Sequence, residues 1–187
     1  MRFDPAWAAR LDDPQRLSAT PPAELWALLD APQGALVVDF GTGTGLFALE
    51  LARARPDLRI AALDEQAPML DHLRAKLAAA PAPGVEPVLT GTPAAEALVG
   101  QAARVLALNV LHEVGDAALA GLRALLAPGG RALFVDWNAA VEDREGPPAE
   151  WCYTPERARA RLEAAGLRVV EEGAAFPTHF ALVCEAP

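Results

Sequence analysis

The chain has 187 residues, 52% of them hydrophobic, and carries a formal net charge of −9 at pH 7. This length predicts a single domain with a substantial core, and the apolar content excludes a disordered chain. The negative charge would repel the phosphate backbone of DNA or RNA, so we expect a small-molecule substrate and no nucleic-acid partner.

The distribution of apolar residues along the chain predicts the cellular location of the protein. No apolar run approaches the roughly 18 residues of a membrane helix, and the first five residues, M-R-F-D-P, lack the apolar core of a signal peptide. We therefore expect a cytoplasmic protein with no membrane partner. The sequence leaves the oligomeric state open, with a homodimer among the alternatives.

The two cysteines and three histidines lie far apart in the sequence. They do not show the spacing of a metal site, so we expect no bound metal. Cys184 lies in an apolar run that is typical of a core strand. Cys152 lies in a polar stretch, where a reactive thiol is an alternative to a buried one.

Residues 1–34 precede the first predicted strand and contain one short predicted helix at residues 23–29. Four large apolar side chains give this arm a surface that can pack on the body of the protein: Phe3, Trp7, Leu11 and Leu17. We expect a structural cover, with a lid over the cofactor or substrate as the alternative. The predicted organisation is an N-terminal helical arm, residues 1–34, and one globular domain, residues 35–187.

A glycine-rich turn follows the first predicted strand, which ends at Asp39. Gly41, Gly43 and Gly45 occupy alternate positions, and a segment of helical composition comes next. Alternating glycines allow a tight turn and a close approach of ligand to backbone, and open α/β sheets bind ligands at this end of a first strand. A dinucleotide fingerprint would need glycine where Leu46 stands, and a P-loop would need a lysine after the glycines, so neither pattern fits.

The remaining elements alternate between helix and strand. Periodicity and breaker residues predict helices at residues 44–55, 66–79, 93–99, 116–127 and 155–165. Strands are predicted at residues 36–38, 58–63, 85–90, 104–109, 131–137, 167–171 and 178–184. The alternation predicts parallel strands, whereas the short link between the last two suits an antiparallel pair. Residues 138–148 form a long polar loop of the kind that often borders a functional site.

Asp64 directly follows the second predicted strand, 19 residues after Gly45. This is close to the offset of about 20 residues at which an acid in nucleotide-binding folds accepts hydrogen bonds from ribose hydroxyls. A carboxylate suits that role because it accepts two donors at once. A helix-capping role is the alternative, and the two roles are compatible.

Three segments resemble motifs of class I S-adenosylmethionine-dependent methyltransferases. They are D-F-G-T-G-T-G at the glycine turn, N-V-L-H-E-V after the fourth strand and L-A-P-G-G before the fifth. The second is similar to the form in the type 11, quinone-biosynthesis branch and differs from the Asn-Pro-Pro-aromatic form of nucleic-acid enzymes. The resemblance covers residues 35–186. It implies an α/β fold with a Rossmann-like, doubly wound, seven-stranded sheet, mostly parallel with an antiparallel C-terminal strand, and S-adenosyl-L-methionine as cofactor.

The same resemblance implies a cofactor site along the strand ends. The residues expected at the methionine end of the cofactor form one run: Asp39, Phe40, Gly41, Gly43 and Gly45. Asp64 and Glu65 should contact the ribose. Met69 is a candidate to pack on the adenine ring, with a core position as the alternative, and Thr92 stands where many relatives carry an acid for the adenine amino group. Asn109, at the next strand end, should flank the methyl group.

The catalytic candidates are His112 and Asn109. His112 suits a general base because the unperturbed pKa of histidine is near 6.5; capping or packing beneath the following helix is the alternative. Glu113 could orient it, although adjacent residues on a helix do not face each other. Asp136 and Trp137 end the fifth strand on the same rim and are the candidates for acceptor binding, since an indole can stack on a flat acceptor.

These observations favour an S-adenosylmethionine-dependent methyltransferase that acts on a small-molecule acceptor by direct in-line transfer. Such a reaction needs no metal and no covalent enzyme intermediate, and orientation can supply most of the rate. The alternative is a catalytically silent module that binds S-adenosylmethionine or S-adenosylhomocysteine in a regulatory role. The third hypothesis is a nicotinamide dehydrogenase, and it is disfavoured because Leu46 stands where a dinucleotide fingerprint needs a glycine.

Overall fold

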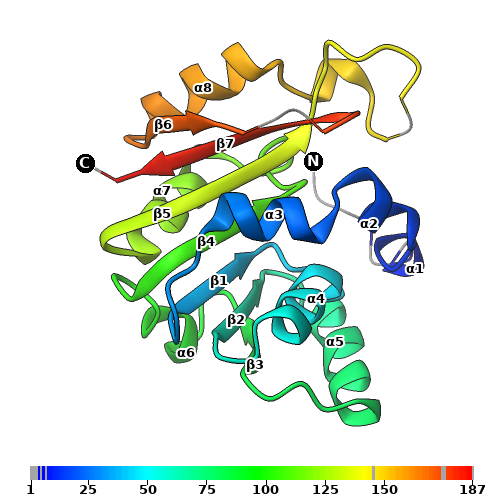
Figure 1. The fold of residues 1–187 in the computed structure, drawn as a ribbon, viewed down its shortest axis with the longest axis vertical. Coiled ribbons are helices and arrows are strands. Elements are labelled where there is room, and N and C mark those ends of the chain that lie inside the picture. The colour runs from blue at the N-terminus through cyan, green and yellow to red at the C-terminus, as the bar shows by residue number, and fades with distance from the viewer. Residues whose placement is uncertain (1–3, 5, 7, 145, 174–175, 187) are drawn as a thin grey trace.

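The computed structural model describes residues 4, 6, 8–144, 146–173 and 176–186. Two of the apolar arm residues, Phe3 and Trp7, lie outside these residues. Within the described ranges, seven strands form one sheet in the order β3-β2-β1-β4-β5-β7-β6 (Figure 1). The strands are Leu36–Phe40 (β1), Arg59–Asp64 (β2), Val85–Leu89 (β3), Ala102–Leu108 (β4), Leu126–Trp137 (β5), Arg168–Glu172 (β6) and His179–Glu185 (β7).

The strand directions match the sequence prediction. The strands β1 to β5 pair in parallel, and β7 is antiparallel to both β5 and β6. The short segment between β6 and β7 returns the chain as an antiparallel pair, because a parallel pair would need a longer crossover. The predicted Rossmann-like fold class is therefore confirmed.

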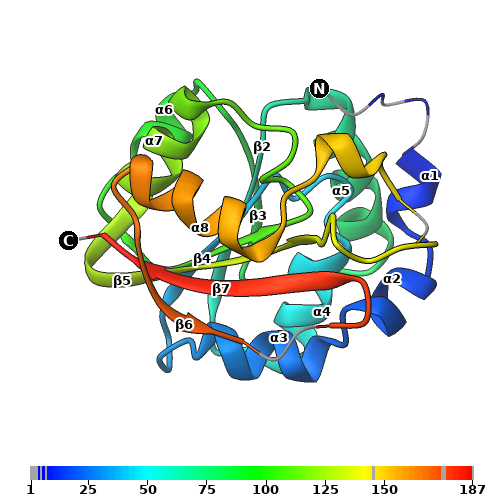
Figure 2. The ribbon, with the colours of Figure 1, turned by 90° about the horizontal axis from the view of Figure 1, so that it is seen from above.

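Helices cover both faces of the sheet. The helices α3 (Pro22–Leu29), α4 (Leu46–Ala54) and α5 (Ala67–Ala79) pack on one face, and α6 (Pro93–Glu96), α7 (Asp116–Leu125) and α8 (Pro155–Ala164) belong to the other. Figure 2 shows α3 and α4 on one side of β7 and α7 and α8 on the other. Two short helices, α1 (Ala8–Leu11) and α2 (Gln15–Ala19), precede α3 and were not predicted.

Each face of the sheet has its own apolar core. Leu25 and Leu51 pack with Leu106 on the α3 and α4 face, whereas Leu119 packs with Phe134 on the α7 and α8 face. Successive side chains of a strand point to opposite faces, so a strand that is buried on both sides reads as a continuous apolar run. This explains the predicted run in β4, whose last five residues are all buried.

The boundary between α7 and β5 differs from the sequence prediction. The prediction placed a helix over residues 116–127 and a strand from residue 131, with Pro128-Gly129-Gly130 between them. Instead, α7 ends at Leu125 and β5 begins at Leu126, which pairs with Ala102 before the register shifts. Gly130 permits this close pairing, because a Cβ there would lie 2.7 Å from the carbonyl oxygen of Ala102.

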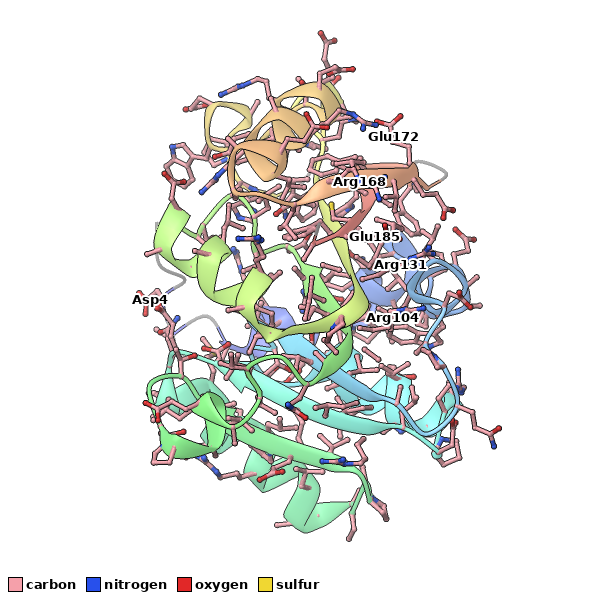
Figure 3. All side chains as sticks on the ribbon, turned by 90° about the vertical axis from the view of Figure 1, so that its left-hand side faces the viewer. Asp4, Arg104, Arg131, Arg168, Glu172 and Glu185 are labelled. Atoms are coloured by element: carbon pink, nitrogen blue, oxygen red, sulfur yellow. The ribbon has the colours of Figure 1, made fainter. Side chains whose placement is uncertain are left out.

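The parallel strands all end on one side of the molecule. In Figure 1 the arrowheads of β1, β4 and β5 point toward the side on which α1, α2 and the segment after β5 lie. Figure 3 views the opposite end, where the Glu185 carboxylate accepts hydrogen bonds from Arg131 at 2.9 Å and Arg168 at 2.8 Å. Such exposed ion pairs contribute little to stability, and ligands of this fold class bind at the other end.

Among the described residues, no helix has the length and apolar character that crossing a bilayer requires. Over the same residues, no group of three or more His, Cys, Asp or Glu side chains is arranged to hold a metal ion. Cys184 is buried, as predicted, and Cys152 is only 1% exposed. Burial raises the pKa of the Cys152 thiol, while Arg144 opposes this shift, so the structure favours the alternative of a buried thiol at this position.

Candidate functional site

The glycine turn folds back onto the end of β2. The backbone N–H groups of Gly41 and Thr42 donate to the carbonyl oxygen of Leu63 at 2.8 and 3.0 Å. Gly41, Gly43 and Gly45 all have positive φ, at 72°, 56° and 81°, a conformation that side chains with a Cβ rarely adopt. The turn is thus a backbone-lined cradle at the carboxyl end of β1, as the spacing of the glycines predicts.

Asp39 lies at the base of this cradle and is 4% exposed. Its carboxylate accepts a hydrogen bond from the Thr42 hydroxyl at 2.6 Å. Burial raises the pKa of Asp39 to about 6, while the Thr42 hydrogen bond acts in the opposite direction. A dehydrated carboxylate at this position favours a cationic ligand group, such as an amino group, that would restore its lost solvation.

We expect Asp39→Asn to stabilise the ligand-free protein at pH 7.5 while it weakens cofactor binding. A pKa that is raised in the folded state stabilises the fold at low pH, and this contribution is lost as the pH rises through about 6. At pH 7.5 the ionised carboxylate therefore costs about 1–3 kcal/mol that asparagine avoids. Urea unfolding of wild type and variant at pH 4.5 and 7.5 measures this; a stability gain of equal size at both pH values would contradict it.

Asp64 is 8% exposed and joins β2 to the turn. One carboxylate oxygen accepts the N–H of Gly43 and the other the N–H of Gln66, both at 2.8 Å. Burial raises the pKa of Asp64, and the hydrogen bonds from Gln66 and Gly43 oppose this shift. Each oxygen keeps a further lone pair, so the side chain can fix the turn and still accept ribose hydroxyls. Its neighbour Glu65 is exposed.

The residues expected near the adenine ring have other contacts in the structure. Met69 is 1% exposed, within α5. The Thr92 hydroxyl donates to the carbonyl oxygen of Leu89 at 2.7 Å and accepts the N–H of Ala95 at 3.4 Å, which caps α6. Phe40 is half-buried and packs against the core on the α7 face. Their contacts with a cofactor therefore stay predictions.

His112 and Asp136 form the most specific polar arrangement at the strand ends. His112 lies in a turn before α7 rather than on a helix, and its Nδ1 is 2.7 Å from one Asp136 carboxylate oxygen. Asp136, at 1% exposure, also accepts the N–H of Trp137 at 2.7 Å and the N–H of His112 at 3.2 Å. Because a carboxylate only accepts, it holds the proton on Nδ1 and leaves Nε2 as an acceptor.

The sequence raised Glu113 as a residue that could orient His112, against the rule that adjacent helical residues do not face each other, and it placed Asp136 among the acceptor contacts. The structure places Asp136 against His112 Nδ1, while the Glu113 carboxylate lies 3.6 Å from Nε2. Asp136 and His112 are 24 residues apart, on segments that only the parallel pairing of β4 with β5 brings together. Sequence spacing carries no signal for such a pair.

Asn109 directly follows the carboxyl end of β4. Its backbone has φ +57°, the left-handed conformation, and its N–H donates to the carbonyl oxygen of Val135 at 2.8 Å. Its side-chain oxygen is buried and has no hydrogen-bond partner among the described residues. A buried acceptor without a donor is costly, so a ligand group that donates a hydrogen bond would be stabilised here.

Trp137 lies on the same rim and stacks on His179, with ring centroids 4.1 Å apart. The Arg144 guanidinium lies 5.4 Å from the Trp137 ring and donates to the carbonyl oxygens of Asn138 and Pro147. His179 Nε2 is buried without a partner among the described residues, and burial lowers its pKa to about 4. The sequence analysis missed His179 and Arg144, because only the β5 and β7 register places His179 beside Trp137.

The N-terminal arm lies over the glycine turn. Leu11 is so close to Gly43 that a Cβ on that glycine would lie 2.9 Å from the Leu11 side chain. Asp12 accepts a hydrogen bond from the Thr44 hydroxyl at 2.6 Å, and Lys76 of α5 lies 2.5 Å from the same carboxylate oxygen. The arm is therefore fixed to the turn and to α5 by polar contacts as well as by apolar packing.

Comparisons with known proteins agree with this fold. Residues 37–130 match the family model described as a methyltransferase domain. A search of curated protein sequences finds no match. Among solved structures, a SAM-dependent methyltransferase from Aquifex aeolicus is similar over 100% of both chains, with 23% identity and a TM-score of 0.88.

Two further structures illustrate the range of similarity. A putative type 11 methyltransferase from Sulfolobus solfataricus has 18% identity and a TM-score of 0.71, over 89% of this chain and 91% of the other. The structure of TnmH has 27% identity and a TM-score of 0.70, over 97% of this chain and 57% of the other. The fold is common to all three, while the predicted type 11 branch stays a prediction.

Proposed function

The chain belongs to the class I S-adenosylmethionine-dependent methyltransferases, and from this premise we propose that it methylates a small-molecule acceptor whose reacting atom carries a proton. S-adenosylmethionine is the cofactor of this family. The observation that carries the proposal is the His112 and Asp136 contact of 2.7 Å at the rim of the glycine turn. A base in a fixed tautomer is useful when the acceptor is a hydroxyl or a carbon acid.

The described residues fit this cofactor. The positive-φ glycines leave the backbone of the turn without side chains, and Asp39 offers a buried carboxylate to an amino group. Asp64 keeps lone pairs for ribose hydroxyls, and the Asn109 side-chain oxygen needs a donor. When bound, the cofactor supplies an electrophilic methyl group on a sulfonium.

The protein's own contribution is orientation and proton removal. His112 Nε2 accepts the proton of the acceptor, and Asp136 stabilises the positive charge that then forms on the ring. Glu113, 3.6 Å from Nε2, adds a second negative charge beside it. Trp137, at the rim beside His179 and Arg144, is the expected aromatic contact of the acceptor, and the arm over the turn limits access of water. Placing the acceptor in line with the transferred group supplies much of the rate.

A silent binding module, the alternative drawn from the sequence, has no use for a histidine held in one tautomer by a buried carboxylate. The described site therefore gives that alternative no support. A small acceptor is favoured over nucleic acid by the net charge of −9, which would oppose a polyanion.

Calorimetric titration with S-adenosylmethionine, S-adenosylhomocysteine and NADH tests the proposal. We expect binding of both sulfur compounds and none of NADH. Transfer of label from methyl-labelled cofactor to a library of hydroxyl compounds and carbon acids then identifies the acceptor class. Lack of binding of either sulfur compound, or label transfer confined to amine acceptors, would contradict the proposal.

A further inference from the structure

Arg16 of α2 is half-buried and has no close ion pair among the described residues. Its guanidinium donates one hydrogen bond, to the carbonyl oxygen of Leu11 at 2.6 Å, and lies 5.3 Å from the centre of the Phe47 ring. Among the described residues, no carboxylate lies within 4.0 Å of it. Arginine has five N–H donors in a planar fork, so most of its hydrogen-bonding capacity has no acceptor here.

Arg16 is connected to the glycine turn through Leu11. Leu11, whose carbonyl accepts from Arg16, is also the residue whose side chain packs over Gly43. Burial lowers the pKa of Arg16, and the nearby charges of Asp39, Asp12 and Asp13 oppose this shift. Asp39 of β1 and Arg16 of the arm both lie near the glycine turn, and the structure shows no ion pair between these two described residues.

The two side chains match the chemistry of one end of the cofactor. S-adenosylmethionine ends in an α-amino acid, which carries an ammonium and a carboxylate side by side. A partly buried charge that lacks a close ion pair is stabilised by a ligand of opposite charge. A planar guanidinium binds a carboxylate through two parallel hydrogen bonds.

We propose that Arg16 binds the carboxylate of the cofactor's amino acid, opposite Asp39, so that the N-terminal arm completes the cofactor site. This inference rests on the proposed function, since it requires S-adenosylmethionine as ligand. It assigns the arm a binding role in addition to its role as a cover. The contacts of Asp12 with Thr44 and Lys76 hold the arm where Arg16 can act.

The test compares S-adenosylmethionine with decarboxylated S-adenosylmethionine, which lacks only the carboxylate. We expect the wild type to bind the complete cofactor at least about 10-fold more tightly. Arg16→Gln should weaken binding of the complete cofactor by about 10- to 100-fold, the scale of hydrogen bonds to a charged group, and should leave affinity for the analogue nearly unchanged. Arg16→Lys should lie between them, because lysine keeps the charge but not the fork.

Arg10→Gln is the matched control, because Arg10 is an exposed arginine of the same arm. It should change neither affinity, and circular dichroism and thermal midpoints should show that all variants are folded. Equal affinity of the wild type for both compounds, or equal loss of both in Arg16→Gln, would overturn the inference and leave the proposed function intact. An unchanged cofactor affinity in Arg16→Gln, together with a raised KM for an acidic acceptor, would also overturn the inference. If the wild type binds neither compound, the proposed function fails, and the inference fails with it.

Discussion

Replacing His112 with alanine should lower kcat by about 10²- to 10⁴-fold, the usual contribution of a general base. The affinity for S-adenosylmethionine should stay nearly unchanged, because none of the expected cofactor contacts involves this ring. The physical reason is that Nε2 is the free acceptor nitrogen, since Nδ1 is 2.7 Å from Asp136. Steady-state kinetics with the identified acceptor, together with calorimetry, measure both quantities.

Two further variants separate a catalytic role from a structural one. Asp136→Asn should also lower kcat, because an amide can donate to Nδ1 and so favour the wrong tautomer. His72→Ala is the control, because His72 is an exposed histidine on α5, and it should leave the rate unchanged. If His112→Ala keeps wild-type activity, the contact with Asp136 serves the fold, and the acceptor loses its proton without help from this residue.

The second large effect is expected at the glycine turn, where Gly43→Val should abolish detectable cofactor binding without unfolding the protein. A Cβ on Gly43 would lie 2.9 Å from the Leu11 side chain, and we expect the rest of the valine side chain to fill space that the cofactor needs beside the turn. Leu11 can move, so the fold should survive. Holding valine at φ +56° costs about 1–3 kcal/mol. Calorimetry measures the binding, and urea unfolding measures the stability.

Two other glycines serve as controls for this prediction. Gly100→Val places valine at φ +70° with no atom within 4 Å of the new Cβ, so it should cost similar stability and leave binding unchanged. Gly45→Val should unfold the protein, because its Cβ would overlap the fully buried Leu73 side chain. Wild-type affinity in Gly43→Val would show that the cofactor does not bind at this turn.

The element order and the strand directions were predictable because they depend on local sequence patterns. An apolar run buried on two faces, a glycine turn and a helix of amphipathic spacing each lie within about 15 consecutive residues. The errors fall where tertiary contacts outweigh local signals. The Pro128-Gly129-Gly130 segment is typical of a break between elements, yet it is part of β5 because Leu126 pairs with Ala102.

The short helices α1 and α2 were missed for a related reason. Helices of four and five residues are too short to show a periodic pattern and are not stable in isolation. The contacts of Asp12 with Thr44 and Lys76, which hold this arm, join residues 32 and 64 positions apart. Sequence patterns within a short window carry no information about such contacts.

By itself, the sequence determined the family, the cofactor and the candidate residues at single strand ends, such as Asp39, Asp64 and Asn109. Each of these lies at the carboxyl end of a predicted parallel strand, and all such ends share one edge of a sheet. Only the tertiary structure decided which groups meet there: His112 with Asp136, Trp137 with His179, and Arg16 with the Leu11 carbonyl beside the turn. These pairs depend on the register of β4, β5 and β7 and on the path of the arm, which are set by packing of the whole chain rather than by local sequence.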